Sequence, residues 1–206
     1  MNPTDLAPWL GVITLAYLLG SIPFGLVLTR LFTDIDIRKA GSGNIGATNV
    51  RRLAGTPLGI ATLVGDIAKG AVPVLLAEFL PASELLAQDA CLALVALAAF
   101  CGHLFPVYMK MKSGGKGVAT AAGCLAVISP LAVLVALAAF LLVAIGSNRV
   151  SAGSLAAAAT LPPAIWLTTH SIAFSASALV IAAGIFLRHS ANIRRLIDGT
   201  EPGIRS

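Results

Sequence analysis

Two glycine-rich segments hold most of the residues whose types and spacing suggest chemistry. The first spans residues 41–52 and reads GSGNIGATNVRR, and the second spans residues 114–117 and reads GGKG. Glycine allows consecutive backbone N–H groups to turn toward one anion, short polar side chains add donors, and arginine offers a fork that matches phosphate oxygens. We expect these segments to bind phosphate groups through Ser42, Gly43, Asn44, Thr48, Asn49, Arg52, Gly114, Gly115, Lys116 and Gly117.

Other uses of these residues compete with phosphate binding. Thr48 or Asn49 could cap a helix that runs on through Arg52, which is compatible with a phosphate site. The GGKG segment lacks the spacing and the preceding strand of a P-loop, so nucleotide binding by that route is not favoured. The sequence shows neither carboxylate pairs nor cysteine–histidine clusters with metal-ligand spacing, so we expect no metal ion and no cofactor.

The composition indicates that both segments are loops of an integral membrane protein. Hydrophobic residues make up 57% of the 206 residues and charged residues 11%, with a mean hydropathy of +0.91. The N-terminus lacks the basic region of a secretory signal, so the first apolar run is expected to remain as a membrane span. Apolar runs cover residues 6–32, with a kink expected at Gly20–Gly25, and residues 57–80, 89–109, 118–145, 155–168 and 172–187. We predict one integral-membrane domain over residues 1–206.

The distribution of charge predicts an orientation. Lysine and arginine fall in residues 30–56, at the start of the second span, in residues 110–116, at Arg149 and in the tail, whereas the opposite loops carry only Asp5, Glu78, Glu84 and Asp89. The positive-inside rule therefore places the N-terminus outside and the glycine-rich loops and the C-terminus in the cytoplasm. If residues 118–145 turn near Pro130 the chain crosses seven times, and if they form one span it crosses six times. The basic tail favours an all-α polytopic bundle of about seven transmembrane helices.

Charged residues also occur inside the second apolar run. Asp66 and Lys69 are three residues apart and share a helix face, so we expect them to turn inward and support a polar site. The alternative is a neutralising pair at the membrane surface. For His103, a hydrogen-bonded structural role and a catalytic role are both open, and we place it among the residues that support the site.

Three motifs resemble those of the bacterial acyl-phosphate-dependent glycerol-3-phosphate acyltransferases. They are residues 41–49 with Arg52, residues 114–120, and His189 followed by Asn192 and by Glu201. The kinked residues 20–25, the Asp66 and Lys69 pair, and Gly102-His103 are similar too, in the same order along nearly the whole chain. The resemblance implies an enzyme of the bacterial inner membrane, with its active site facing the cytoplasm. Such enzymes move a fatty acyl group from acyl phosphate to sn-glycerol-3-phosphate, which yields lysophosphatidic acid and phosphate in the first acylation step of phospholipid synthesis.

Roles for individual residues follow from the residues and the resemblance together. We predict that Arg52 and Lys116 clamp phosphates, and the resemblance implies that the second motif serves glycerol-3-phosphate. His189 and Asn192 are expected on one helical face, where they would orient the nucleophile or the oxyanion, and either His189 or a substrate phosphate accepts the proton. Ser151 completes the predicted catalytic set, although the segment Asn148-Arg149-Val150-Ser151 leaves Ser154 open as the serine of that motif.

The expected partners are acyl phosphate, glycerol-3-phosphate and membrane lipid, with no nucleic acid. The alternative function is a membrane transporter for a phosphorylated organic anion, because basic residues and broken helices also mark transport sites. A transporter predicts polar residues near the bilayer midplane and a repeat between the two halves. Here the polar segments gather at one predicted membrane face and no inverted repeat is seen in the sequence.

Overall fold

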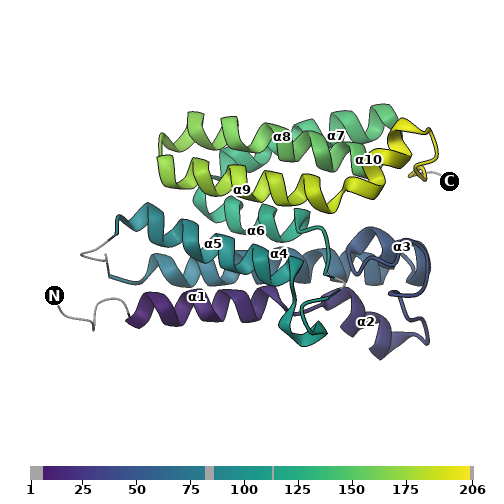
Figure 1. Cartoon of the computed structure of the whole chain (residues 1–206), viewed down its shortest axis with the longest axis horizontal. Coiled ribbons are helices and arrows are strands. Elements are labelled where there is room, and N and C mark those ends of the chain that lie inside the picture. The colour runs from purple at the N-terminus through teal and green to yellow at the C-terminus, as the bar shows by residue number, and fades with distance from the viewer. Residues whose placement is uncertain (1–6, 82–85, 113, 205–206) are drawn as a thin grey trace. The chain divides into compact units, whose positions relative to one another are not determined.

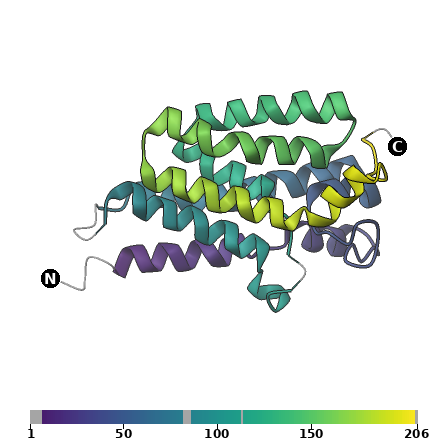
Figure 2. The same ribbon diagram turned by 45° about the horizontal axis from the view of Figure 1, so that its top comes forward.

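The computed structural model describes residues 7–81, 86–112 and 114–204, and within those ranges every regular element is a helix. Asp5 and Glu84, which entered the orientation prediction, lie outside the described residues. The chain folds as two compact units, the first ending at Val127 and the second beginning at Ile128. The course of the chain through the helices of each unit can be followed in Figure 1 and Figure 2.

The first apolar run of unit 1 is broken where the sequence predicts a kink. α1 (Ala7–Gly20) and α2 (Phe24–Phe32) meet at an angle of 43°. Pro23 stands directly before α2, where its missing N–H costs no intrahelical hydrogen bond. Gly20 packs against the carbonyl of Ala99, and a Cβ at Gly20 would collide with that carbonyl. Gly20 therefore lets α1 approach α5 (Gln88–Leu104) closely, and the two helices lie side by side in Figure 1.

Close backbone contact also joins the remaining long helices of unit 1. α4 (Thr56–Glu78) crosses α6 (Val118–Ile128) at two glycines, since Gly70 faces the carbonyl of Thr120 and Gly123 faces the carbonyl of Ile67. Small residues at helix crossings permit this approach in membrane proteins. α4 and α6 are thereby held together at the level of the charged residues of α4.

Unit 2 is a set of three long helices followed by a short one. The elements are α7 (Pro130–Ser147), α8 (Val150–Thr169), α9 (Ile172–Arg188) and α10 (Ser190–Ile197). Asn148 and His170 adopt left-handed conformations at the ends of α7 and α8, so each helix reverses into the next through a two-residue turn. Ser129 caps α7 by accepting a hydrogen bond from the N–H of Ala132, and α9 and α10 are bent by 60° at His189.

The helix lengths confirm a multi-spanning α-helical membrane protein. Among the residues that the structure describes, four helical segments are long and apolar enough to cross a bilayer, and up to six spans result if each bent pair counts as one span. Residues 118–145, which the sequence allows as one span or two, are not one helix, because a break at Ser129 separates the 11-residue α6 from the 18-residue α7. The expected third span, residues 89–109, is confirmed by the apolar segment Gln88–Met109, in which a 3₁₀ turn, η2 (Val107–Met109), follows the end of α5 at Leu104.

Candidate phosphate-binding and catalytic residues

The first glycine-rich segment is organised by Asn49. The helix α3 (Ala47–Ala54) begins after Gly46, so Thr48 and Asn49 lie inside it, and the prediction that one of them caps the helix is wrong. Asn49 is 2% exposed; its Oδ1 accepts from the N–H of Ser42 at 3.0 Å, and its Nδ2 donates to the carbonyls of Ile37, Ala40 and Asn44 at 3.3, 3.3 and 2.9 Å. The side chain thus ties the loop before α3 to the helix.

The backbone of this loop depends on its glycines. Gly41 and Gly43 have φ values of +58° and +67°, in the left-handed region that glycine tolerates best. A Cβ at Gly41 would also collide with Oδ1 of Asn49. The side chains of Ser42, Thr48 and Arg52 are left exposed around this fixed loop, which is the arrangement that an anion-binding loop needs.

The second glycine-rich segment is anchored to the end of α5. The N–H of Gly115 donates to the carbonyl of His103 at 3.1 Å, and the Cα of Gly115 lies so close to the His103 ring that a Cβ there would overlap the imidazole. Gly117, at φ +82°, packs against the ring of Phe100 in the same way. Lys116 therefore lies between two glycines that pack tightly against side chains of α5, directly before α6 begins.

The charged residues of α4 form a buried polar cluster next to this anchor. Asp66 Oδ1 and Lys69 Nζ are 2.8 Å apart with side chains 4% and 2% exposed, and Lys69 also donates to the carbonyl of Ile22 at 2.7 Å. Both side chains are buried in unit 1, so the predicted inward orientation of the pair is confirmed. His103 Nδ1 lies 3.2 Å from Thr120 Oγ1 and 3.7 Å from Asp66 Oδ1. His103 is thus a hydrogen-bonded buried residue that links the ion pair to the Gly115 loop.

In unit 2, His189 occupies the bend between two helices. It is the C-cap of α9 and the N-cap of α10, and its carbonyl accepts from the N–H of Ile193 at 2.8 Å, so His189 opens the helical turn that carries Asn192. Its Nδ1 lies 2.8 Å from the carbonyl of Ile185, and because a carbonyl only accepts, Nδ1 carries the proton. In the neutral ring Nε2 is consequently the basic nitrogen.

Glu201 is a site residue that the sequence-based selection of candidates omitted. Its carboxylate accepts from Asn192 Nδ2 at 2.6 Å and from Arg195 Nε at 2.7 Å. Burial raises the pKa of Glu201, but hydrogen bonds from Ser151, Asn192 and Arg195 outweigh that effect and lower the pKa. The signal for this residue is the Gly199-Thr200-Glu201 sequence, in which Gly199, at φ +70°, lets the chain turn back toward α10.

The two serines at the start of α8 differ in what their hydroxyls do. Ser154 Oγ donates to the carbonyl of Val150 at 3.0 Å and is used by its own helix. Ser151 Oγ is buried, and no described residue lies in full hydrogen-bond geometry with it. The hydroxyl still lies near enough to the Glu201 carboxylate to help lower the pKa of Glu201. A buried hydroxyl of this kind is available to a ligand, which favours Ser151 over Ser154.

Comparison with known proteins places the chain in a family. The family model for glycerol-3-phosphate acyltransferase matches residues 10–199. The glycerol-3-phosphate acyltransferase of Syntrophotalea carbinolica is 53% identical over 186 residues, and that of Geobacter sulfurreducens 47% over 186 residues; each alignment covers 90% of this chain and 92% of the relative.

Solved structures agree with the sequence relatives. The crystal structure of PlsY, an integral membrane glycerol 3-phosphate acyltransferase, in its glycerol 3-phosphate form matches with a TM-score of 0.88 and 35% identity over 96% of both chains. The lysophosphatidic acid form of PlsY matches with a TM-score of 0.86, also at 35% identity, over 96% of this chain and 95% of that one. The chain therefore belongs to the glycerol-3-phosphate acyltransferase family.

Proposed function

We propose that this chain transfers a fatty acyl group from acyl phosphate to sn-glycerol-3-phosphate, releasing lysophosphatidic acid and phosphate. The observation that carries the proposal is the family match over residues 10–199. The structural relatives are named for a glycerol 3-phosphate form and a lysophosphatidic acid form, which correspond to the acceptor and the product of this reaction. Acyl phosphate as donor rests on the resemblance of the three motifs to the acyl-phosphate-dependent enzymes.

The glycine-rich loops of unit 1 serve the phosphates in this proposal. Backbone N–H groups of residues 42–44 and 114–117 bind phosphate oxygens, and Arg52 and Lys116 add charge-assisted hydrogen bonds. The support is the fixed geometry of both loops: Asn49 ties the first to α3, and the imidazole of His103 packs against the second. Asp66 and Lys69 act indirectly, by holding His103 in place beside the loop.

The residues of unit 2 serve the acyl transfer itself. The glycerol hydroxyl attacks the acyl carbon, a tetrahedral intermediate forms, and the carbon–oxygen bond to phosphate breaks. The proton of the hydroxyl passes either to Nε2 of His189 or to a substrate phosphate oxygen. Asn192, whose amide is oriented by Glu201, and Ser151 supply hydrogen bonds to the reacting groups. Because acyl phosphate is already activated, positioning and charge stabilisation are the main requirements.

We further propose that residues 1–206 act as one catalytic domain that crosses the bacterial inner membrane seven times, with the N-terminus outside and both glycine-rich loops in the cytoplasm. The break at Ser129 supports two crossings in residues 118–147. With 11 residues, α6 is shorter than the roughly 20 residues that a full span needs, so it requires a locally thinned bilayer or cover by other protein. Reporter fusions at residue 129 and after residue 206 should report opposite sides of the membrane, and the same side would contradict seven crossings.

The decisive experiment supplies purified protein in lipid with glycerol-3-phosphate and one of three donors: acyl phosphate, acyl-CoA or acyl carrier protein. Lysophosphatidic acid should form from acyl phosphate alone. Arg52→Ala and Lys116→Ala should each reduce the rate by roughly a hundredfold or more, the usual loss when one charge-stabilising donor is removed, whereas Lys39→Ala, at an exposed lysine, should not.

Failure with every donor, or full activity in both alanine variants, would refute the enzyme proposal. Accumulation of labelled glycerol-3-phosphate inside vesicles that lack a donor would instead support the transporter alternative. Family membership favours the enzyme.

A further inference from the structure

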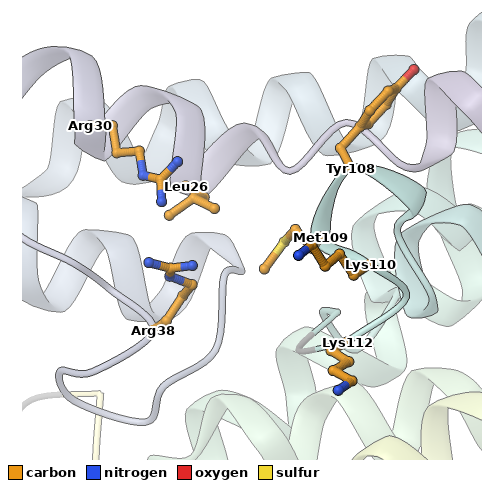
Figure 3. Close-up of a pocket in the computed structure, with 7 residues that line it drawn as sticks. All are labelled: Leu26, Arg30, Arg38, Tyr108, Met109, Lys110 and Lys112. Atoms are coloured by element: carbon orange, nitrogen blue, oxygen red, sulfur yellow. The ribbon is translucent and has the colours of Figure 1, made fainter.

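A second concentration of positive charge lies in unit 1, outside the predicted site residues. A cavity of about 320 Å³ is lined by residues of α2, the following loop and the turn after α5, which are Leu26, Arg30, Arg38, Tyr108, Met109, Lys110 and Lys112. Figure 3 shows the guanidinium groups of Arg30 and Arg38 facing each other, with Met109 and the two lysines on the opposing turn. Two segments that are far apart in the sequence thus enclose one basic cavity.

Little negative charge offsets these four cations. Asp36 pairs with Arg38, at 2.7 Å to the terminal guanidinium nitrogen and 2.8 Å to Nε. Within the described part of the chain, Arg30, Lys110 and Lys112 make no ion pair. Like charges gathered around a cavity repel one another and raise the local concentration of anions. The cavity has the electrostatics of an anion-binding site.

The wall that carries the lysines has a strained backbone. Lys110 and Met111 are consecutive non-glycine residues with φ values of +55° and +58°. Each left-handed residue of this kind costs on the order of 1 kcal/mol. Hydrogen bonds from the N–H groups of Lys110, Met111 and Lys112 to preceding carbonyls, at 3.0–3.1 Å, hold the turn in this conformation. Such strain is concentrated at functional sites, where it preorganises a binding geometry.

The two segments that line the cavity also carry exposed apolar side chains. Leu31 and Phe32 at the end of α2 are 70% and 67% exposed, and Tyr108 and Met111 on the opposing turn are 60% and 59% exposed. Exposed apolar and aromatic side chains beside lysine and arginine are characteristic of segments that lie at a membrane interface and contact anionic lipid. A cavity for a free anion in solution needs no such apolar neighbours along the chain.

We propose that this cavity binds the phosphate of an anionic phospholipid headgroup, and that the exposed apolar side chains of the two lining segments contact the lipid chains. None of the lining residues belongs to the predicted acyl-transfer site, and the proposal does not depend on the proposed function. The site would hold a structural or regulatory lipid of the surrounding membrane. Phosphate is the recognised group, and either a lipid or a free phosphate ion can present it. The exposed apolar side chains on the same two segments are the reason for choosing the lipid.

The test is native mass spectrometry of the purified full-length chain, titrated with phosphatidylglycerol or with phosphatidylcholine of the same acyl chains. Wild type should bind phosphatidylglycerol more tightly. The double variant Arg30→Gln/Lys112→Gln should lose that affinity by about tenfold or more, at about 1 kcal/mol for each basic residue near the lipid surface. The control Lys39→Gln/Arg194→Gln removes the same charge from positions outside the cavity and should keep the affinity within about twofold.

Three outcomes would overturn the proposal. An equal loss of phosphatidylglycerol affinity in both double variants would mean that net charge attracts the lipid diffusely. An unchanged affinity in the cavity variant would exclude this cavity as the binding site. Displacement of phosphatidylglycerol by millimolar inorganic phosphate alone would assign the cavity to free phosphate. Circular dichroism spectra and thermal unfolding temperatures of each variant should match those of wild type. If the cavity double variant unfolds at a lower temperature, the single variant Lys112→Gln replaces it and should also lose affinity for phosphatidylglycerol.

Discussion

Asn49→Asp tests whether one amide side chain organises the first phosphate loop. The two side chains are nearly the same size, and an aspartate still accepts a hydrogen bond from the N–H of Ser42. It cannot donate, so the two amide N–H groups that Asn49 shares among the carbonyls of Ile37, Ala40 and Asn44 are lost. A buried carboxylate would also face those three carbonyl oxygens.

The magnitude follows from the number of lost donors. Two N–H groups at roughly 1 kcal/mol each give at least about 2 kcal/mol, which corresponds to about a thirtyfold increase in local opening of the loop. Burial of the unpaired carboxylate adds to this value. Hydrogen exchange of a peptide covering residues 37–50, in detergent or nanodiscs, measures that opening directly.

Asn44→Asp is the matched control. It introduces the same charge in the same loop, but Oδ1 of Asn44 only accepts, from the N–H of Gly46 at 2.9 Å, and an aspartate preserves this bond. Loop exchange in Asn44→Asp should stay close to wild type. If Asn49→Asp exchanges no faster than wild type, or if both variants loosen the loop equally, the reasoning about Asn49 is refuted.

Three further predictions concern the other parts of the candidate site. Gly115→Ala should lower the rate of acyl transfer by about a hundredfold, because the new Cβ overlaps the buried imidazole of His103 and displaces the loop by about an ångström. Gly146→Ala is the control: no atom lies within 4 Å of its new Cβ, so the rate should stay unchanged. Lys69→Met should lower the free energy of unfolding by about 3–5 kcal/mol, because it leaves its aspartate partner buried and unpaired, and Lys39→Met at an exposed position should have little effect. Because the pKa of Glu201 is lowered in the folded protein, its contacts stabilise the fold fully at a pH above the unfolded pKa of about 4.5. This stabilisation is lost as the pH falls through the pKa of Glu201 in the folded state. Glu201→Gln should remove this pH dependence from thermal unfolding curves.

Each of these predictions has an outcome that contradicts it. Equal activity of the two glycine variants would show that the packing beside Gly115 does not position the loop. A small stability change in Lys69→Met would mean that the buried aspartate finds another partner or a proton. Unfolding curves of wild type and Glu201→Gln that fall in parallel below a pH of about 4.5 would exclude Glu201 as the titrating group.

The sequence alone determined the features that depend on local pattern. Runs of apolar residues identify the long helices, the cluster of Gly20 and Pro23 identifies the bend between α1 and α2, and Ser129-Pro130 marks the break between α6 and α7. The composition of the glycine-rich segments is enough to indicate phosphate chemistry, and the order of the motifs is enough to indicate the family. These signals are local because propensity, proline sterics and hydropathy act over neighbouring residues.

Only the tertiary structure decided what individual polar side chains do. The sequence offers Asn49 as a helix cap or a phosphate contact, and the tertiary structure shows that its side chain ties the preceding loop to α3. Lys69 donates a hydrogen bond to a carbonyl 47 residues away in the sequence, and His103 is hydrogen-bonded to Thr120, 17 residues away. The carboxylate of Glu201 accepts a hydrogen bond from Asn192 of α10. The number and direction of hydrogen bonds at a buried polar group depend on partners that packing brings together, and the composition of a segment does not encode them.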